Sequence, residues 1–411
     1  MRSRRDELEL LLGTLASGLS ALGFITLASR SLGIGRMGPV VHLWTIWALS
    51  AGVLNLSVQQ HVIVSPETYR SVISVMCSGQ VLKIVLPLTG GVALSTVIWG
   101  TEFFGAGSAH WPLLASSIPL GCASVAAARG LWARRRAFRT IALLFATENI
   151  LRVAVAVALS LSDAGPISFS LAILIGFAVA LYGPRDKSQP IGMLQPTSRT
   201  HGGAIAGLLG HATLVLPPSL MAVKSAEVLE TSSVFLLLAL LRSPYQLALG
   251  LIPKFAVDRL SHRLPSTDSG SVTQPANKVQ PTARTRWLFG TILSLAIVGG
   301  SLLLPDLLDA LFGTEVTVSP IESLLAAAAT FLAILNLWQT IAVSDSDLNR
   351  QLMSVWMSSS FLGLIILMIP SRISMVFTLS VMFGIEGLVA IGLYLTLRTH
   401  QLPFFSGSSL A

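Results

Sequence analysis

One arginine lies where an apolar membrane segment should carry no charge. Arg242 is near the middle of VFLLLALLRSPYQLALGLIP, and Pro244 follows it, where a proline loosens a helix. A charge at the centre of a bilayer costs roughly 2.5–3.5 kcal/mol on insertion scales, so it usually faces a protein interior or a hydrated cavity. Such a guanidinium either contacts an anionic group of a substrate or pairs with a neighbouring helix. Tyr245 and Gln246 extend the polar patch and favour the contact with substrate.

A second charged position is a pair. Glu148 and Arg152 are four residues apart in another apolar segment, a spacing that places both side chains on one face of a helix. Their charges largely cancel. The pair is therefore interpreted equally well as a structural ion pair between helices or as part of a substrate site.

Three further observations concern polar residues in apolar surroundings. The segment near 40–62 is polar along one side, which either holds helices together or lines a wetted surface. His211 lies close to Pro217 and Pro218 and is either a hydrogen-bonded core residue or a proton carrier. Glu386 is the only acid near the centre of an apolar segment in the C-terminal half, a candidate for ion coupling or for pairing with an arginine.

The segments that hold these residues are long enough to cross a bilayer. A spanning helix needs about 20 mostly apolar residues, because an unpaired backbone amide in hydrocarbon costs several kcal/mol. The sequence predicts twelve such helices, near 10–29, 40–62, 72–98, 111–128, 140–161, 167–183, 203–222, 232–252, 287–305, 321–342, 351–370 and 373–396. The first follows arginines and resembles a secretory signal, but its length predicts a permanent helix.

The basic residues predict the orientation of these helices. With a cytoplasmic N-terminus, twenty of the 27 basic residues fall in inside segments, among them Arg129 and Arg134. Only four fall outside, namely Arg30, Arg36, Lys224 and Arg372, and three lie within spans, namely Lys83, Arg152 and Arg242. This positive-inside asymmetry predicts a multi-pass protein of the plasma (inner) membrane with both termini in the cytoplasm.

Composition excludes several classes of protein. The chain has 411 residues, of which 53% are hydrophobic and only 11% charged, too few charges for a soluble domain. The net charge of +8 follows from topology, so we expect no nucleic-acid partner. Cys77 and Cys122 have no CxxC spacing or nearby histidine, and no nucleotide or metal motif is present. We therefore expect no enzyme activity, no cofactor and no metal site.

Two polar segments divide the chain. Residues 184–202 separate helices 1–6 from helices 7–12, which predicts an N-terminal six-helix lobe (1–183), a cytoplasmic linker (184–202) and a C-terminal lobe (203–411). The stretch near 260–286 is rich in Ser, Thr, Pro and Gln and is predicted to be a disordered cytoplasmic loop of the second lobe.

Several passages together resemble one family. The segment ALGFITLASRSLGIGRMG, with Arg30-Ser31-Leu32-Gly33 and then Gly38, resembles the "A-R-x-L-G then G" junction of polysaccharide and oligosaccharide-lipid flippases of the multidrug/oligosaccharidyl-lipid/polysaccharide (MOP) exporter superfamily. Three further passages resemble the same family in their place in the chain and in their character: the one around Glu148 and Arg152, RSPYQLALGLIPKFAV, and DLLDALFGTEVTVSPIESLLAAAA. Ile34-Gly35-Arg36-Met37 departs from the acidic and aromatic pattern usual there.

The resemblance implies a fold and a task. The fold would be all-α, with about twelve transmembrane helices in two six-helix lobes around a central cavity that opens alternately to each side, as in MOP and MATE transporters. The substrate would be an oligosaccharide or polysaccharide precursor on a polyprenyl diphosphate, moved from the inner to the outer leaflet. Arg242 and Arg152 would meet the diphosphate, and His42, Asn55, Gln59 and Tyr245 would bind sugar hydroxyls. Glycosyltransferases or a polymerase of the pathway would be partners.

Two other functions stay open at this point. A cation-coupled MATE-like exporter of small amphipathic compounds would share the fold, but it should carry an unpaired acid deep in the cavity. A non-transporting membrane scaffold of an envelope polysaccharide assembly would keep the helices and tolerate the loss of Arg242.

Overall fold

The fold is taken from a computed structural model. It describes residues 2–65, 69–104, 110–183, 212–213, 215–224, 227–242, 299–313, 316, 318–344, 349–370 and 372–399. Within those ranges every regular element is helical, which confirms the predicted all-α class. The predicted linker (184–202) and the loop near 260–286 lie outside the described residues, so the division into two lobes remains a prediction.

The helices follow the predicted spans closely. In chain order they are α1 (Arg2–Leu32), α2 (Gly38–Leu54), α3 (Gln60–Val64), α4 (Val72–Met76), α5 (Gly79–Ile98), α6 (Gly100–Phe104), α7 (Trp111–Arg134), α8 (Phe138–Ser160), α9 (Pro166–Ile175), α11 (Pro217–Val223), α12 (Val228–Leu241), a helix over 299–312, α15 (Pro320–Ser344), α16 (Asn349–Met368) and α17 (Met375–Thr399). Short turns of other helical types join some of them: η1 (Ile34–Arg36), the π-type turn η2 (Asn55–Gln59) and η3 (Gly176–Tyr182).

Eight described helices are long and apolar enough to cross a membrane. They correspond to the first five and the last three predicted spans, and the apolar stretches Pro166–Tyr182 and Val228–Leu241 are shorter. The chain is therefore a multi-pass membrane protein, although parts of the seventh, eighth and ninth predicted spans lie outside the described residues.

Two predicted boundaries differ from the structure. The predicted span 72–98 is divided at Cys77, because Ser78 accepts a hydrogen bond from Val81 N and starts a new helix, α5. The predicted span 111–128 continues as α7 to Arg134. Arg129, assigned from the sequence to a cytoplasmic loop, is instead a buried residue of α7, so that assignment was wrong.

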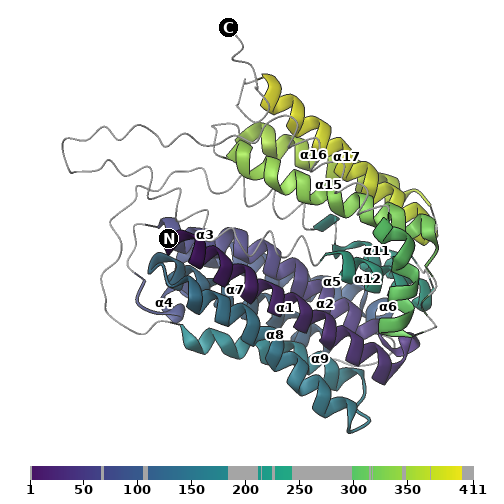
Figure 1. The fold of residues 1–411 in the computed structure, drawn as a ribbon, viewed down its shortest axis with the longest axis horizontal. Coiled ribbons are helices and arrows are strands. Elements are labelled where there is room, and N and C mark those ends of the chain that lie inside the picture. The colour runs from purple at the N-terminus through teal and green to yellow at the C-terminus, as the bar shows by residue number, and fades with distance from the viewer. Residues whose placement is uncertain are drawn as a thin grey trace, which may run out of the picture.

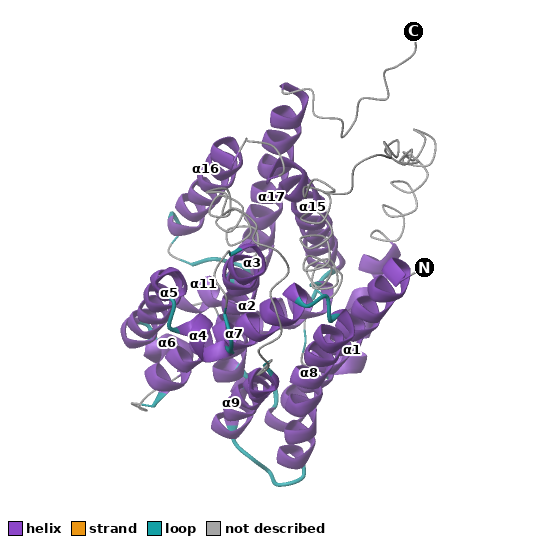
Figure 2. Cartoon of the chain, turned by 90° about the vertical axis from the view of Figure 1, so that its left-hand side faces the viewer, coloured by secondary structure: helices purple, strands orange, loops and turns teal. Residues whose placement is uncertain are grey.

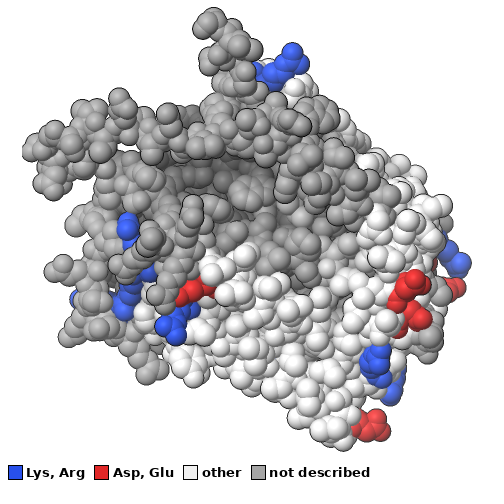
Figure 3. Space-filling view, in the orientation of Figure 1, with Lys and Arg blue, Asp and Glu red and all other residues white. Residues whose placement is uncertain are grey.

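The surface fits a bilayer environment. Large apolar side chains are exposed along several helices, for example Leu19, Leu94, Phe361 and Ile391. A soluble protein rarely leaves so much contiguous apolar surface uncovered. Charged side chains gather toward the two ends of the view in Figure 3, with a mostly uncharged band between them. Lipid chains would cover this band.

The helices form two groups. In the first half, α1 packs along α8, and α7 packs against α2 and α5; in the second half, α17 packs against α15 and α16 (Figure 1). Figure 2 shows the same grouping, with α15 to α17 above α1, α8 and α9. One apolar core joins the two groups through α12, and it contains Phe24 and Trp44, whose rings stack 5.0 Å apart.

Candidate functional site

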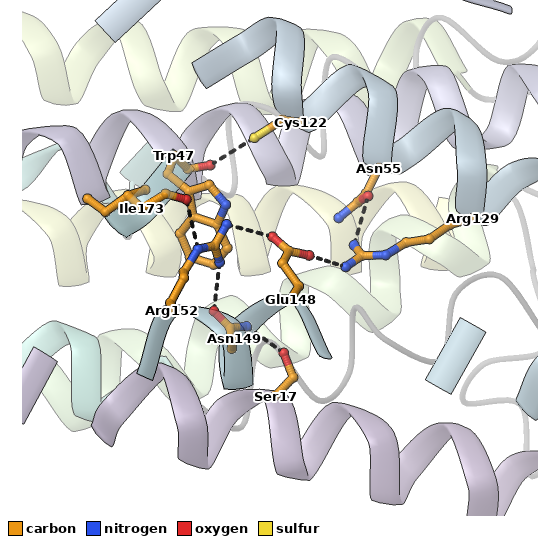
Figure 4. Close-up of polar contacts among 9 residues, drawn as sticks. All are labelled: Ser17, Trp47, Asn55, Cys122, Arg129, Glu148, Asn149, Arg152 and Ile173. Atoms are coloured by element: carbon orange, nitrogen blue, oxygen red, sulfur yellow. Dashed lines mark hydrogen bonds and ion pairs between the residues drawn. The ribbon is translucent and has the colours of Figure 1, made fainter. Parts of the chain in front are cut away.

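Buried ionic and polar side chains form two clusters in the described residues. The first lies inside the first half, between α1, η2, α7, α8 and α9 (Figure 4). The second lies in the second half, between α15, α17 and the residues that precede α11.

The first cluster is centred on Glu148 of α8. Its Oε1 accepts a hydrogen bond from Arg152 Nη2 at 2.8 Å, one turn along the same helix. Its Oε2 accepts one from Arg129 Nη2 at 2.5 Å, from the neighbouring helix α7. The predicted pair is thus present as an ion pair, and a second arginine makes it a triad with one net positive charge.

Arg152 is completely enclosed, with 0% of its surface exposed. Besides Glu148, it donates to Asn149 Oδ1 at 2.6 Å and to the carbonyl of Ile173 at 3.0 Å. Its guanidinium carbon lies 4.4 Å from the centre of the Trp47 ring, a favourable cation–π distance. With this burial and these partners, Arg152 holds helices together and offers no surface to a substrate in this conformation.

Local backbone structure makes room for that guanidinium. At Gly176 the α-helix α9 gives way to the 3-10 turn η3. A Cβ atom added to Gly176 would lie only 2.6 Å from Arg152 Nε and 2.7 Å from its Cζ. The missing side chain of Gly176 is therefore a condition for the position of Arg152.

Arg129 and Asn149 complete the cluster and were not identified from the sequence. Arg129 is 4% exposed, lies 3.8 Å from the centre of the Phe145 ring, and has Nη1 3.5 Å from Asn55 Oδ1. Asn149 Nδ2 donates to Ser17 Oγ of α1 at 2.7 Å. The continuous helix-forming run through Ala128 and Trp132 was the signal that Arg129 belongs to a helix.

The second cluster surrounds Glu386 of α17, which is 0% exposed. Its Oε1 accepts a short hydrogen bond from Thr213 Oγ1, and its Oε2 accepts one from Asn336 Nδ2 at 2.7 Å. Asn336 Nδ2 also lies 2.9 Å from the carbonyl oxygen of Glu386. No described cation pairs with this carboxyl group, so the predicted pairing with an arginine is absent from the described residues.

An oxygen of Asn336 that accepts no hydrogen bond from a described group and an apolar cavity lie close to Glu386, and Gln339 follows Asn336 by three residues on α15. Asn336 Oδ1 and Gln339 Oε1 are buried, and no described group donates a hydrogen bond to either. A cavity of about 180 Å³ lies between α11, α16 and α17 and is lined by Thr213, Ile385 and mainly apolar residues such as Leu364 and Met382. An acid with only neutral partners and oxygen acceptors nearby has the composition of a site for a proton or a hard cation.

Arg242 ends α12 and is only 5% exposed. Its backbone N–H donates to the carbonyl of Leu238 at 2.9 Å. Among the described residues, no acid or other acceptor is paired with its guanidinium. Tyr245, Gln246 and His211, the other residues predicted near this site, lie outside the described residues.

The polar residues of the second predicted span do not gather at one place. His42 is buried, its Nδ1 lies 3.2 Å from Ser219 Oγ of α11, and its ring centre lies 4.5 Å from that of Phe103. Asn55 faces Arg129, as described above, and Gln59 is buried in η2. None of these positions tests the predicted contact with sugar hydroxyls.

Comparisons with known proteins give little further information. No family model and no curated protein matches the chain. Among solved structures, one that matches is a crystal structure of an aspartate-to-asparagine mutant of the MATE transporter VcmN from Vibrio cholerae. It is 11% identical, with a TM-score of 0.44 over 97% of this chain and 98% of that chain. A likeness of this size does not place the chain in a family.

Proposed function

We propose that this chain is a plasma-membrane transporter that moves a polyprenyl-diphosphate-linked oligosaccharide or polysaccharide precursor from the inner to the outer leaflet by alternating access. Both termini would be cytoplasmic, and glycosyltransferases or a polymerase of the same pathway would supply or consume the glycan. The observation that carries this proposal is the position of Arg242, buried at the end of α12 without a described partner.

The energetic argument starts from the cost of that position. Leaving a buried charge without a partner costs several kcal/mol, and a protein retains such a charge where a ligand compensates it. A guanidinium has five N–H donors in a planar fork that matches phosphate oxygens, so a diphosphate would offset the cost with charge-assisted hydrogen bonds. The lipid tail would stay in the bilayer while the headgroup passed through the protein. Arg152, enclosed by its own partners, has only a structural role in this proposal.

Glu386 would supply the energy coupling in this scheme. A carboxyl group that is held by Thr213 and Asn336, with no described cation beside it, binds or releases a proton or a metal cation without breaking an ion pair. The cation and the anionic substrate would bind to different conformations of the transporter. Their binding would then be linked through the equilibrium between those conformations.

The same residue favours a second candidate function. A cation-coupled exporter of small amphipathic compounds needs an acid without a cationic partner near an apolar cavity, and within the described part of the chain Glu386, with the cavity lined by Leu364 and Met382, meets that description. A third candidate, a non-transporting scaffold, has no specific observation in its favour.

One experiment separates these functions. The purified full chain is reconstituted in liposomes, and two probes are followed under an imposed proton or sodium gradient: a fluorescent polyprenyl-diphosphate disaccharide and an amphipathic organic cation. Movement of the glycolipid alone supports the proposal. Movement of the organic cation alone supports the exporter, and movement of neither supports the scaffold.

A further inference from the structure

Three of the four basic residues predicted outside the membrane bind the C-terminal carbonyls of helices. Arg36, the last residue of η1, donates from Nε to the carbonyl of Leu32 at the end of α1, at 3.0 Å. Lys224 Nζ donates to the carbonyls of Met368 and Pro370, at the end of α16, at 3.0 and 3.3 Å. The last four carbonyls of a helix have no intrahelical partner and carry partial negative charge, which a cation satisfies.

Arg30 makes the same kind of contact, but across the molecule. It lies in the last turn of α1, and its Nε donates to the carbonyl of Leu311 at 2.9 Å while its Nη2 donates to that of Ala310 at 2.5 Å. These carbonyls end the helix 299–312 of the second half. Gly313 follows that helix with φ of 107°, a positive value that favours glycine, and its N–H donates to the carbonyl of Asp309 at 2.9 Å.

The contact joins the last turn of α1 to the C-terminus of the helix 299–312. The guanidinium of Arg30 offsets the partial negative charge at that C-terminus. Because Arg36 already satisfies a carbonyl of α1, Arg30 is available to the other half.

Other contacts between the halves lie at the same end of the helices. His42 of α2 meets Ser219 of α11, and α12 packs against α1, α2 and η1. In Figure 1 the described helices of the two halves meet on the right, near α6, α11 and α12. The positive-inside asymmetry predicts that the end where the halves meet faces outside.

We propose that Arg30 is a latch that holds the transporter closed to the outside and that must release the carbonyls of Ala310 and Leu311 before substrate leaves. The latch rests on the alternating-access part of the proposed function, but not on the identity of the substrate. Arg30 acts by stabilising one conformation, since two charge-assisted hydrogen bonds are present only when the halves meet.

The test measures conformation directly and does not require transport. Spin labels are attached in a Cys77→Ser, Cys122→Ala background at two pairs of exposed positions. The pair Leu161→Cys and Ile369→Cys reports the outer ends of the two halves. The pair Leu8→Cys and Leu395→Cys reports the inner ends. Distance distributions are recorded by double electron–electron resonance in lipid nanodiscs.

Arg30→Ala is compared with Arg36→Ala, which also removes a guanidinium from a helix C-terminus but whose hydrogen bond, to the carbonyl of Leu32, stays within the first half. We expect Arg30→Ala to raise the population with long outer and short inner distances about tenfold, equivalent to ~1.4 kcal/mol. Arg36→Ala should leave both distributions as in the wild type. Arg30→Lys, which retains the charge but not the fork, should give an intermediate shift.

Several outcomes would overturn the latch. Unchanged distances in Arg30→Ala would do so, as would equal shifts in Arg30→Ala and Arg36→Ala, which would point to helix capping in general. If Arg30→Ala does not fold, the shift of Arg30→Lys relative to the wild type decides in the same way. If Arg30→Ala shifts the distances but the wild type moves no glycolipid in liposomes, the latch is supported and the proposed substrate is wrong.

Discussion

Arg129 and Glu148 meet at 2.5 Å between α7 and α8, although they are 19 residues apart in the chain. This contact makes Glu148 the shared anion of two buried arginines, since Arg152 occupies its other oxygen. The triad therefore ties α7 to α8, and removing its single anion leaves two buried cations without their shared partner.

Glu148→Gln should strongly destabilise the protein. A glutamine keeps the shape and accepts hydrogen bonds, but it cannot compensate the charges of Arg129 and Arg152, and breaking a buried pair typically costs ~3–5 kcal/mol. We expect a marked fall in the thermal midpoint of the detergent-purified protein. The midpoint is measured by size-exclusion chromatography of samples heated to a series of temperatures. Asp163→Asn, in an exposed turn, is the control. Equal midpoints for the two variants would contradict a structural triad.

Gly176→Ala should also destabilise the first half, by a different mechanism. The added methyl group would lie 2.6 Å from Arg152 Nε, so either η3 or the guanidinium must move, at a cost of about 1–3 kcal/mol. Gly165→Ala is the matched control, because a Cβ there meets no atom within 4 Å. The thermal midpoints of the two variants are compared, and no difference between them would refute the steric argument.

The sequence predicts much of this first half but not its full ion network. Helical spacing alone placed Glu148 beside Arg152, because residues four apart share a face. Arg129 was missed because the apolar run ends at Ala128, whereas the helix continues to Arg134 once a buried acid stabilises the charge. Whether a charge ends a membrane helix or is buried within it depends on a partner from another helix, and such partners are set by tertiary packing.

Glu386→Gln should leave the fold intact and strongly weaken energy coupling. The amide oxygen of a glutamine can accept from Asn336 Nδ2, and its amide N–H can donate to the hydroxyl of Thr213, so the thermal midpoint should stay close to that of the wild type. Stimulation of transport by a proton or sodium gradient should fall ~5- to 150-fold, the usual range of a coupling free energy. Gradient-driven transport in liposomes is measured for the wild type and for Glu386→Gln. Retention of gradient stimulation by Glu386→Gln would exclude Glu386 from coupling.

For the second half, the sequence identified Glu386 but neither of its partners. Thr213 and Asn336 are ordinary polar residues in apolar segments, where such side chains commonly hold helices together. Thr213 and Asn336 are 173 and 50 residues away from Glu386 in the sequence, so no local spacing of residues predicts the cluster. The capping contacts of Arg30, Arg36 and Lys224 were likewise hidden, although these residues stood out as exceptions to the positive-inside pattern.

The orientation is tested by labelling single cysteines in intact cells. Leu161→Cys, at the end of α8, should react with a membrane-impermeant thiol reagent, and Gly270→Cys should not react until the membrane is opened. The expectation follows from the distribution of basic residues between loops. A Cys77→Ser background removes the exposed native thiol. Reaction at position 270 in intact cells would reverse the predicted topology.

The central claim, that Arg242 binds the diphosphate of a lipid-linked glycan, is tested most directly by glycolipid movement in liposomes containing Arg242 variants, with thermal stability measured on the same preparations. The account predicts that Arg242→Ala folds with a thermal midpoint no lower than that of the wild type but moves the glycolipid about 30-fold more slowly or worse, a loss of ~2 kcal/mol or more. Arg242→Lys should retain part of the rate. Arg398→Ala, at the exposed end of α17, should behave as the wild type. An unchanged rate in Arg242→Ala, or a rate that falls only together with the thermal midpoint, would contradict the claim.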